Sequence, residues 1–534
     1  MSTPEFDASE SAVLSRYFTN LDRPVFALRN LPEVVKGALF SRYSRTEKSL
    51  RRVLLDEFIN EPDSGFDRLA AAAPGEDDMV AVRRAEEFYE RVLVGYGDDS
   101  VAELAGAHVA VEQTSTLAAK ALEDSRIGIS PLEKSTRYVR FDRPGPDGRY
   151  LYHRGPELTV HPDYERAADA LFAAYSSLVE PVTLAIRERF PQEEGETDRA
   201  WKSATRAKAL DLLRGLLPAG TLTNLGLFGN GRAFEYLITK MAAHELPECR
   251  RLATDLHREL SLVIPAFVRR ALDERYGMPA AERIEHVRES VKGMVPSPTL
   301  PGERGGSLPA SVRLLEYDPD AERKVVAAAV FPHSDRPLDE LPADPARVLE
   351  ALLADRANRR HRAPRALEHA QYEFEIVANF AAYRDLHRHR MLTQDRQLLG
   401  TSLGYDSPPG LSDLGLEGRF RHSVEAAADA HRRLEHDLGP ALAQYLVPLA
   451  FHVRWYFRVN LREIYHLCEL RTTPQGHPDY RWVAQEMFRL VSEVHPLLAG
   501  YASFVDMGPG DELERRRSER RIDEKLSALD RGVR

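Results

Sequence analysis

Apolar and polar residues alternate along two short stretches of the chain, 312–317 and 372–377, and alternation at period two predicts half-buried strands. The Ala/Val-rich stretch 321–330 suits a packed helix. Longer stretches with apolar residues at helical spacing predict amphipathic helices at 165–189, 248–275 and 423–446. The pattern therefore predicts an α+β (α/β-like) class in which helix dominates.

One ordered set of residues occurs twice. Glu103, Arg126, Leu217-Pro218 and Asn230-Gly231-Arg232 are repeated as Glu368, Arg390, Val447-Pro448 and Asn460-Leu461-Arg462. The Glu-to-Arg intervals are 126 − 103 = 23 and 390 − 368 = 22, and the Pro-to-Asn intervals are both 12 (230 − 218 and 460 − 448). Equal spacing at both ends predicts a duplicated domain with an insertion in the middle of one copy.

The duplication predicts where the parts of the chain begin and end. Segment 107–112 occupies the place in the first copy that the strand 372–377 occupies in the second. Pro and Gly between 295 and 306 break both periodicities, which predicts a linker. We expect an N-terminal segment at 1–30, the first copy at 31–276, the linker at 277–310, the second copy at 311–510 and a charged tail at 511–534.

Composition narrows the class of protein. The chain has 534 residues, of which 43% are hydrophobic and 29% charged, which excludes disordered and fibrous proteins. Its charge of 73 − 83 = −10 argues against an indiscriminate nucleic-acid binder. No apolar run approaches the ~18–20 residues that span a bilayer, and the acidic start lacks the features of a signal peptide. We therefore expect a cytoplasmic protein.

The cysteines and the tail offer little chemistry. Cys249 and Cys468 are too few for a disulfide framework, are not spaced as a metal or redox pair, and fit small buried apolar residues in helices. The tail alternates in charge sign, which fits either a solvated helix or a segment that meets an anionic partner.

The densest basic cluster is Arg384-Asp385-Leu386-His387-Arg388-His389-Arg390, which we place in a helix after the strand 372–377. Guanidiniums on one turn repel each other unless an anion joins them, and a phosphate suits their paired donors. A solvated basic face, or arginines paired with core carboxylates such as Glu368, is the alternative. A metal site at His387 and His389 is weaker, because residues i and i+2 on a helix diverge.

In the first copy, Ser130-Pro131-Leu132-Glu133-Lys134-Ser135-Thr136-Arg137-Tyr138 occupies the corresponding place. Pro131 favours a loop, whose hydroxyls and amides beside an arginine can hold a phosphoryl group. The alternative is a helix that Ser130 caps, with Glu133 three residues later.

These two segments resemble the flavin-dependent thymidylate synthases. That family carries Arg-His-Arg, a spacer, and then Asn-Glu-x-Ser-x-Arg-Tyr. Arg388-His389-Arg390 matches the first half and Glu133-Lys134-Ser135-Thr136-Arg137-Tyr138 the second, so the motif is divided between the copies. Further positions divide in the same way. A phosphate-gripping arginine that precedes the Asn is Arg214 in the first copy (230 − 214 = 16) and Gln444 in the second (460 − 444 = 16). A pyrimidine-associated arginine that follows the Asn is Arg471 in the second copy (471 − 460 = 11) and Met241 in the first (241 − 230 = 11).

The resemblance implies two tandem copies of the family fold with one composite site. The substrate-binding residues would be Glu133, Ser135, Arg137, Arg214, Arg388 and Arg471. The cofactor-binding residues would be His389, Arg390, Glu368, Asn460, Arg462, Asn230 and Arg232. No catalytic side chain, cysteine nucleophile or metal ligand is assigned. Asp385 stands where the family usually has Gln, and beside a nucleotide phosphate it would need an arginine partner.

By resemblance, the reaction would be the reductive methylation of deoxyuridylate with FAD, methylenetetrahydrofolate and NADPH. Arg396 stands in place of the motif Glu, and His466 in place of an Asn that often contacts flavin. A diverged protein that binds flavin, a nucleotide or both is therefore a second hypothesis, and a structural or interaction protein on the same fold is a third. Family members are homotetramers, so two chains would supply four copies, and we expect a homodimer.

Overall fold

We describe a computed structural model of the chain, covering residues 6–44, 46–60, 102–125, 127–295, 308–341, 344–513 and 515–532. Arg126 of the sequence repeat lies outside these residues. The chain forms two compact units. Unit 1 comprises Met1–Thr114, Ala118–Glu133 and Asn224–Ser297, and unit 2 comprises Ser115–Leu117, Lys134–Thr223 and Pro298–Arg534.

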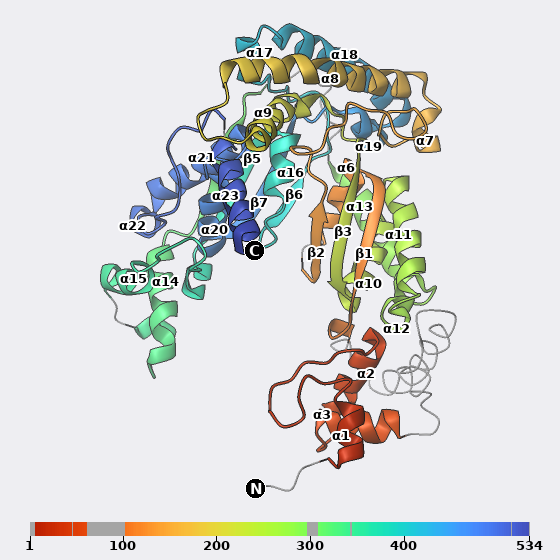
Figure 1. The fold of residues 1–534 in the computed structure, drawn as a ribbon, viewed down its shortest axis with the longest axis vertical. Coiled ribbons are helices and arrows are strands. Elements are labelled where there is room, and N and C mark those ends of the chain that lie inside the picture. Colours follow the sequence, from red (N-terminus) through yellow and green to blue (C-terminus); the bar gives the residue numbers. More distant parts are fainter. Residues whose placement is uncertain are drawn as a thin grey trace. The chain divides into compact units, whose positions relative to one another are not determined.

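Unit 1 contains a three-stranded sheet in the order β1-β3-β2 (Figure 1), with β1 at Gly106–Ser115, β2 at Ile129–Glu133 and β3 at Leu222–Asn230. β2 pairs antiparallel with β3. The Asn230 side chain accepts a hydrogen bond from Ala233 N (2.8 Å) and caps the helix that follows β3. The helices are α1 Ala8–Leu14, α2 Glu33–Tyr43, α3 Leu50–Leu54, α6 Thr116–Glu123, α10 Gly231–Ala242, α11 Pro247–Leu260, α12 Pro265–Val268 and α13 Gly277–Met294.

Unit 2 contains a four-stranded antiparallel sheet in the order β4-β5-β7-β6. Its strands are β4 Ser311–Tyr317, β5 Gln371–Asn379, β6 Thr393–Arg396 and β7 His452–Asn460. Alternate β7 side chains, among them Trp455 and Phe457, are buried, as the two-residue repeat of a strand requires. Phe374 on β5 lies opposite Phe457, and the pair contributes to the core.

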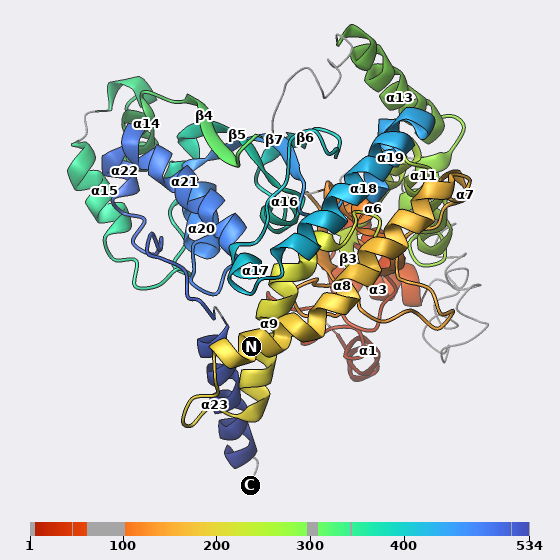
Figure 2. The ribbon, with the colours of Figure 1, turned by 90° about the horizontal axis from the view of Figure 1, so that it is seen from above.

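Helices surround this sheet. Asn379 caps α16 and Asn460 caps α20, each by accepting a backbone N–H three residues later. The long helices α8 and α18 pack side by side, and α9 packs on α8 (Figures 1 and 2). The α-helices of the unit are α7 Pro156–Thr159, α8 Pro162–Arg189, α9 Asp198–Leu213, α14 Ala321–Val330, α15 Pro345–Leu353, α16 Phe380–Leu386, α17 Pro409–Asp413, α18 Glu417–Leu438, α19 Pro440–Ala443, α20 Leu461–Arg471, α21 Pro478–Val494, α22 Pro496–Ala499 and α23 Arg516–Gly532.

The boundary of the units does not follow the boundary of the copies. Residues 134–223 belong to the first copy by sequence but lie in unit 2 with the second copy. Pro218 and Pro448 form an antiparallel bridge, in which Ala219 N donates to Val447 O and Leu449 N to Leu217 O, both at 2.9 Å. Because 217 + 230 = 447 and 219 + 230 = 449, the two bonds are equivalent. The copies therefore meet here about a local pseudo-twofold axis.

The α+β class is confirmed, and several local expectations need correction. The predicted linker includes helix α13, while its Pro/Gly-rich part at 296–307 lies outside the described residues. The basic cluster is only partly helical, because α16 ends at Leu386. Segment 129–133 is a strand rather than a loop or a capped helix. Pro131 is compatible with this strand because β2 lies at the sheet edge, where a missing N–H removes no inner hydrogen bond.

Helix α8 is the one helix among the described residues that could span a membrane by length and composition. It packs against α9 and α18, and 44% of its most apolar window is buried. Core helices of soluble proteins pass the same test, so its apolar face is explained by packing.

Candidate functional site

Arg137 is held rigidly in the loop that follows β2. Its guanidinium forms two parallel bonds to Asp211 on α9, with Nε–Oδ1 at 2.8 Å and Nη2–Oδ2 at 2.6 Å, and Nη1 donates to the Tyr480 hydroxyl on α21 (3.3 Å). Ser135 Oγ accepts the Arg137 N–H (3.2 Å) and shapes the loop. Burial works to lower the pKa of Arg137, but the charge and hydrogen bonds of Asp211 raise it above its usual value.

Arg214 follows α9 directly and is 3% exposed. Its Nη1 donates to Asp385 Oδ2 on α16 (2.9 Å), so Asp385 has the arginine partner that a carboxylate beside a phosphate would need. Arg214 Nε and Nη2 are buried and have no hydrogen-bond partner among the described residues. Buried donors of this kind are costly unless an acceptor reaches them, so the site is suited to a ligand oxygen.

Four arginines lie near enough to Asp385 for their charges to act on its carboxyl. Burial raises the pKa of this carboxyl, but the charges of Arg214, Arg388, Arg137 and Arg471 outweigh burial and hold it well below its usual range. Arg137 and Arg214 come from the first copy, and Arg388 and Arg471 from the second. Unit 2 thus brings together the four arginines that the sequence assigns to the substrate.

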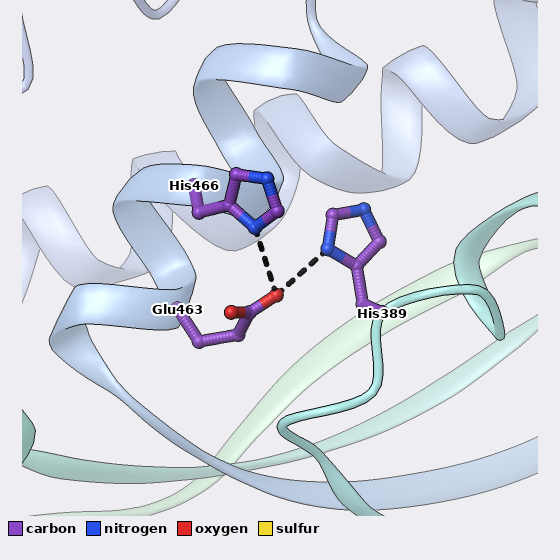
Figure 3. Close-up of side chains that lie close together, drawn as sticks. All are labelled: His389, Glu463 and His466. Carbon is purple, nitrogen blue, oxygen red and sulfur yellow. Dashed lines mark hydrogen bonds and ion pairs between the residues drawn. The ribbon is translucent and has the colours of Figure 1, made fainter. Parts of the chain in front are cut away.

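Arg471 is oriented by a buried hydrogen-bonded chain, of which Figure 3 shows His389 and Glu463. Arg471 Nε donates to His389 Nε2 (2.9 Å), and His389 Nδ1 lies 2.8 Å from Glu463 Oε1. An arginine can only donate, so His389 Nε2 must accept, and the proton on Nδ1 points to Glu463. Burial lowers the pKa of His389 to about 4, which keeps the ring neutral near pH 7.

His389, Glu463 and His466 are close enough to hold a metal ion, with ligand atoms within 4.8 Å of one another. Their hydrogen bonds instead favour a positioning relay, in which Glu463 orients His389 and His389 orients Arg471. A cation on His389 Nδ1 would move the ring proton to Nε2, where it would face the Nε–H of Arg471. Burial raises the pKa of Glu463, but its hydrogen bonds to His389 and His466 lower it to about 2.

A cavity of about 230 Å³ adjoins Arg214 within unit 2. Its walls combine apolar side chains with polar groups, and Ser407 Oγ, like two of the Arg214 nitrogens, is buried and has no hydrogen-bond partner among the described residues. The apolar wall includes Leu212, Pro408, Phe420 and Leu449, and the polar wall includes Asp211, Arg214, Asn379, Asp406, Ser407, His477 and Asp479.

The Asn-x-Arg residues that the sequence assigns to the cofactor form the same arrangement in each copy. Arg462 donates to Glu368 (2.8 Å) and Arg232 to Glu103 (2.9 Å), and the preceding asparagines cap α20 and α10. These contacts explain the repeated Asn-x-Arg through the fold. Their binding of a cofactor stays a prediction.

Three further predicted residues lie in different settings. Glu133 belongs to unit 1, where it pairs with the fully buried Lys120 (2.9 Å). Arg390 is exposed just beyond α16, and Ser135 is half-buried.

Sequence reasoning missed Asp211, Tyr480 and Glu463. Asp211 stands three residues before Arg214, but no sequence signal paired either Asp211 or Tyr480 with Arg137.

A family model described as thymidylate synthase complementing protein matches this chain twice, at residues 53–266 and 313–497. The chain belongs to this family. The two matched segments confirm the predicted resemblance and a tandem arrangement of the family unit. Family membership shows that the protein is thymidylate synthase-like.

Relatives of this family member fall into two groups. A UPF0159 protein of Chlamydia pneumoniae is 44% identical over 94% of this chain and 95% of its own length. A flavin-dependent thymidylate synthase of Geobacter sulfurreducens is 32% identical over 37% of this chain and 87% of its own length. A solved UMP/dUMP methylase, PolB from Streptomyces cacaoi bound with 5-Br dUMP, has a TM-score of 0.31 at 19% identity, covering 37% of this chain and 96% of that chain.

Proposed function

We propose that the protein catalyses the reductive methylation of deoxyuridylate at one composite site that both copies build. The methylene group would come from methylenetetrahydrofolate, and the two electrons that convert it to a methyl group from NADPH. The observation that carries this proposal is the convergence of Arg137 and Arg214 with Arg388 and Arg471 around Asp385. The relative named as a flavin-dependent thymidylate synthase supports the reaction type.

The arginine cluster supplies the binding chemistry. Two nitrogens of Arg214, Nε and Nη2, have no partner among the described residues and offer their N–H groups to a phosphate, while Nη1 is fixed on Asp385. Arg137 is fixed by Asp211 and Tyr480, so its contribution to binding requires little ordering. The His389–Glu463 relay fixes Arg471, whose guanidinium carbon lies 5.5 Å from the Tyr480 ring centre, toward the proposed base end of the nucleotide.

The proposal includes FAD because a relative is named as a flavin-dependent thymidylate synthase. Arg390 is exposed and the Arg462 side chain is 32% exposed, so both offer donors that fit a diphosphate, while buried His389 would border the ring system. Bound there, the flavin would supply the redox chemistry of the methylation. A cytoplasmic location and a homodimer complete the proposal.

The decisive test uses purified wild-type protein. We expect a flavin absorption spectrum that NADPH bleaches, and tritium release from ring-labelled deoxyuridylate when methylenetetrahydrofolate, FAD and NADPH are all supplied. We expect Arg137→Ala and Arg471→Met each to weaken deoxyuridylate binding by about 1–3 kcal/mol, because each removes a charged donor. Arg206→Gln, at an exposed position on α9, is the matched control. Absence of tritium release under these conditions contradicts the proposal.

One observation favours a second candidate, a diverged paralogue that binds flavin or nucleotide without making thymidylate. The motif glutamate is absent from the second copy, and Glu133 of the first is held by Lys120 in unit 1. Nucleotide binding without tritium release identifies this candidate.

A further inference from the structure

The C-terminal segment 506–532 lies beyond residue 497, where the family match ends. From sequence, its charged part could be a solvated helix or a segment for an anionic partner. The structure instead ties it to unit 2 at three places. Two of these places are immediately next to residues of the arginine cluster.

The first tie joins the segment to α20 and α21. Asp506 N donates to Thr472 Oγ1 (2.9 Å), and Arg481 Nη2 donates to both Asp506 Oδ1 (3.1 Å) and Gly508 O (2.8 Å). Arg481 Nε also donates to Thr472 O (2.7 Å), which closes the network. Thr472 directly follows Arg471, and Arg481 directly follows Tyr480. The segment therefore begins against the wall that carries Arg471 and Tyr480.

The second tie reaches the loop that carries Arg137. The Arg515 guanidinium carbon lies 3.9 Å from the centre of the Tyr138 ring, close enough for a cation–π contact. Tyr138 directly follows Arg137 and is 51% exposed. Arg515 Nε is buried without a hydrogen-bond partner among the described residues, so the described contact that Arg515 makes with the loop is this stacking.

The third tie fixes helix α23 itself. α23 lies along α9 (Figure 2), where Arg199 bonds to Glu519 (3.0 Å). Arg516 forms a hydrogen bond with Glu193 (2.6 Å) and an ion pair with Glu196 (3.2 Å) beyond the end of α8. α9 also carries Asp211, the partner of Arg137. Arg515 therefore projects from a segment that is anchored on both sides of it.

We propose that the C-terminal segment is a positioning element of the substrate site, and that Arg515 is its positioning residue for the loop 134–141. By stacking on Tyr138, Arg515 holds this loop in place, so that Arg137 is ordered before the substrate arrives. Ordering the loop in advance lowers the cost of binding. This inference rests on the proposed function, in which Arg137 binds the nucleotide.

The test compares three folded variants. Arg515→Ala removes the stacking, Arg515→Lys keeps a cation on the ring, and Arg517→Ala alters a neighbour whose side chain is 82% exposed. Two quantities are measured: amide hydrogen exchange of peptides covering 134–141 without ligand, and the dissociation constant for deoxyuridylate by calorimetry. Thermal unfolding verifies that each variant is folded.

For Arg515→Ala we expect exchange of the loop to be faster, and deoxyuridylate to bind more weakly, each by about three- to fivefold. Arg515→Lys should restore most of both, and Arg517→Ala should match the wild type. Equal loop exchange in Arg515→Ala and Arg517→Ala overturns the inference. Faster exchange with unchanged affinity also overturns it. If the wild type binds no uridine nucleotide, the proposed function fails, and the exchange result alone decides whether Arg515 holds the loop.

Discussion

At three equivalent positions, the first copy carries one cation and two carboxylates, whereas the second copy carries three basic side chains. In the first copy, Lys120 on α6 is fully buried between Glu123 and Glu133, with its Nζ 2.9 Å from the Glu133 carboxylate. One cation and two carboxylates therefore form a buried ionic network inside unit 1. The carboxylates outnumber the lysine in this network, so it gives an anionic ligand no reason to bind.

In the second copy, the corresponding residues are basic. α6 begins at Thr116 and α16 at Phe380, so the offset between the helices is 380 − 116 = 264, and Lys120 and Glu123 correspond to Arg384 and His387. Glu133 lies opposite Leu225 and Arg396 opposite Trp455, and 225 + 230 = 455 makes these strand positions equivalent. A histidine and an arginine thus replace the two carboxylates.

A second pair of positions shows the reverse loss. Gln444 occupies in the second copy the place of Arg214, and backbone groups satisfy its carboxamide: Oε1 accepts from Leu399 N (3.0 Å) and Nε2 donates to Ala441 O (3.1 Å). Arg214 instead keeps two nitrogens, Nε and Nη2, without a hydrogen-bond partner in the part of the chain that the structure describes. At this pair of positions, the copy that has lost the family arginine satisfies its glutamine with backbone groups, and the copy that has kept the arginine leaves polar groups for a ligand.

The largest expected effect comes from opening the network of the first copy. Lys120→Met leaves Glu123 and Glu133 buried without their shared cation, so we expect the free energy of unfolding to fall by about 3–5 kcal/mol. Chemical denaturation measures this. If the network is purely structural, deoxyuridylate affinity stays unchanged under conditions where the variant is folded. Weaker binding would instead show that Glu133 serves the substrate, and the two copies would then differ less than we infer.

The next largest effect is expected at Arg214, whose place in the second copy is taken by Gln444. Arg214→Gln installs the residue of Gln444 and leaves Asp385 without its hydrogen-bonded partner, so we expect the free energy of unfolding to fall by about 3 kcal/mol, and nucleotide binding to be lost. Adding Asp385→Gln, which installs the usual family residue, should recover most of the stability but not the binding. Full binding by Arg214→Gln in calorimetry would contradict the assigned role.

The family resemblance predicted that Arg137 and Arg214 lie near Arg388 and Arg471, and the spacing of Arg214 before Asn230 (230 − 214 = 16) is part of that resemblance. The partners of these arginines were not predictable in the same way. Arg137 meets Tyr480 across 343 residues, a contact that only the folded chain creates. The sequence also did not show that the asparagines assigned to a cofactor use their side-chain oxygens to cap helices.

Fold class followed from periodicity, but the grouping of the parts did not. Alternation located β4 and β5. The sequence repeat implied two separate copies, whereas residues 134–223 lie in the unit of the second copy. Backbone pairing around Pro218 and Pro448 joins residues 134–223 to the second copy. Such pairing between distant segments leaves no periodic signal in the sequence.

The smallest effect is a dependence of stability on pH that belongs to the second copy alone. His389 has a pKa of about 4 in the folded protein, below the ordinary value of 6.5, because it is buried. The unfolded chain therefore binds a proton as the pH falls below 6.5 while the folded chain does not, so His389 lowers stability progressively until pH 4. Between pH 7 and pH 5 this amounts to about 2 kcal/mol. The first copy has Ser125 at the equivalent position (389 − 264 = 125), and hence no such group.

Denaturation curves of the wild type and His389→Gln at both pH values measure the effect. On acidification we expect the variant to lose less stability than the wild type, by about 2 kcal/mol. Equal losses would show that burial does not hold His389 neutral in the folded protein.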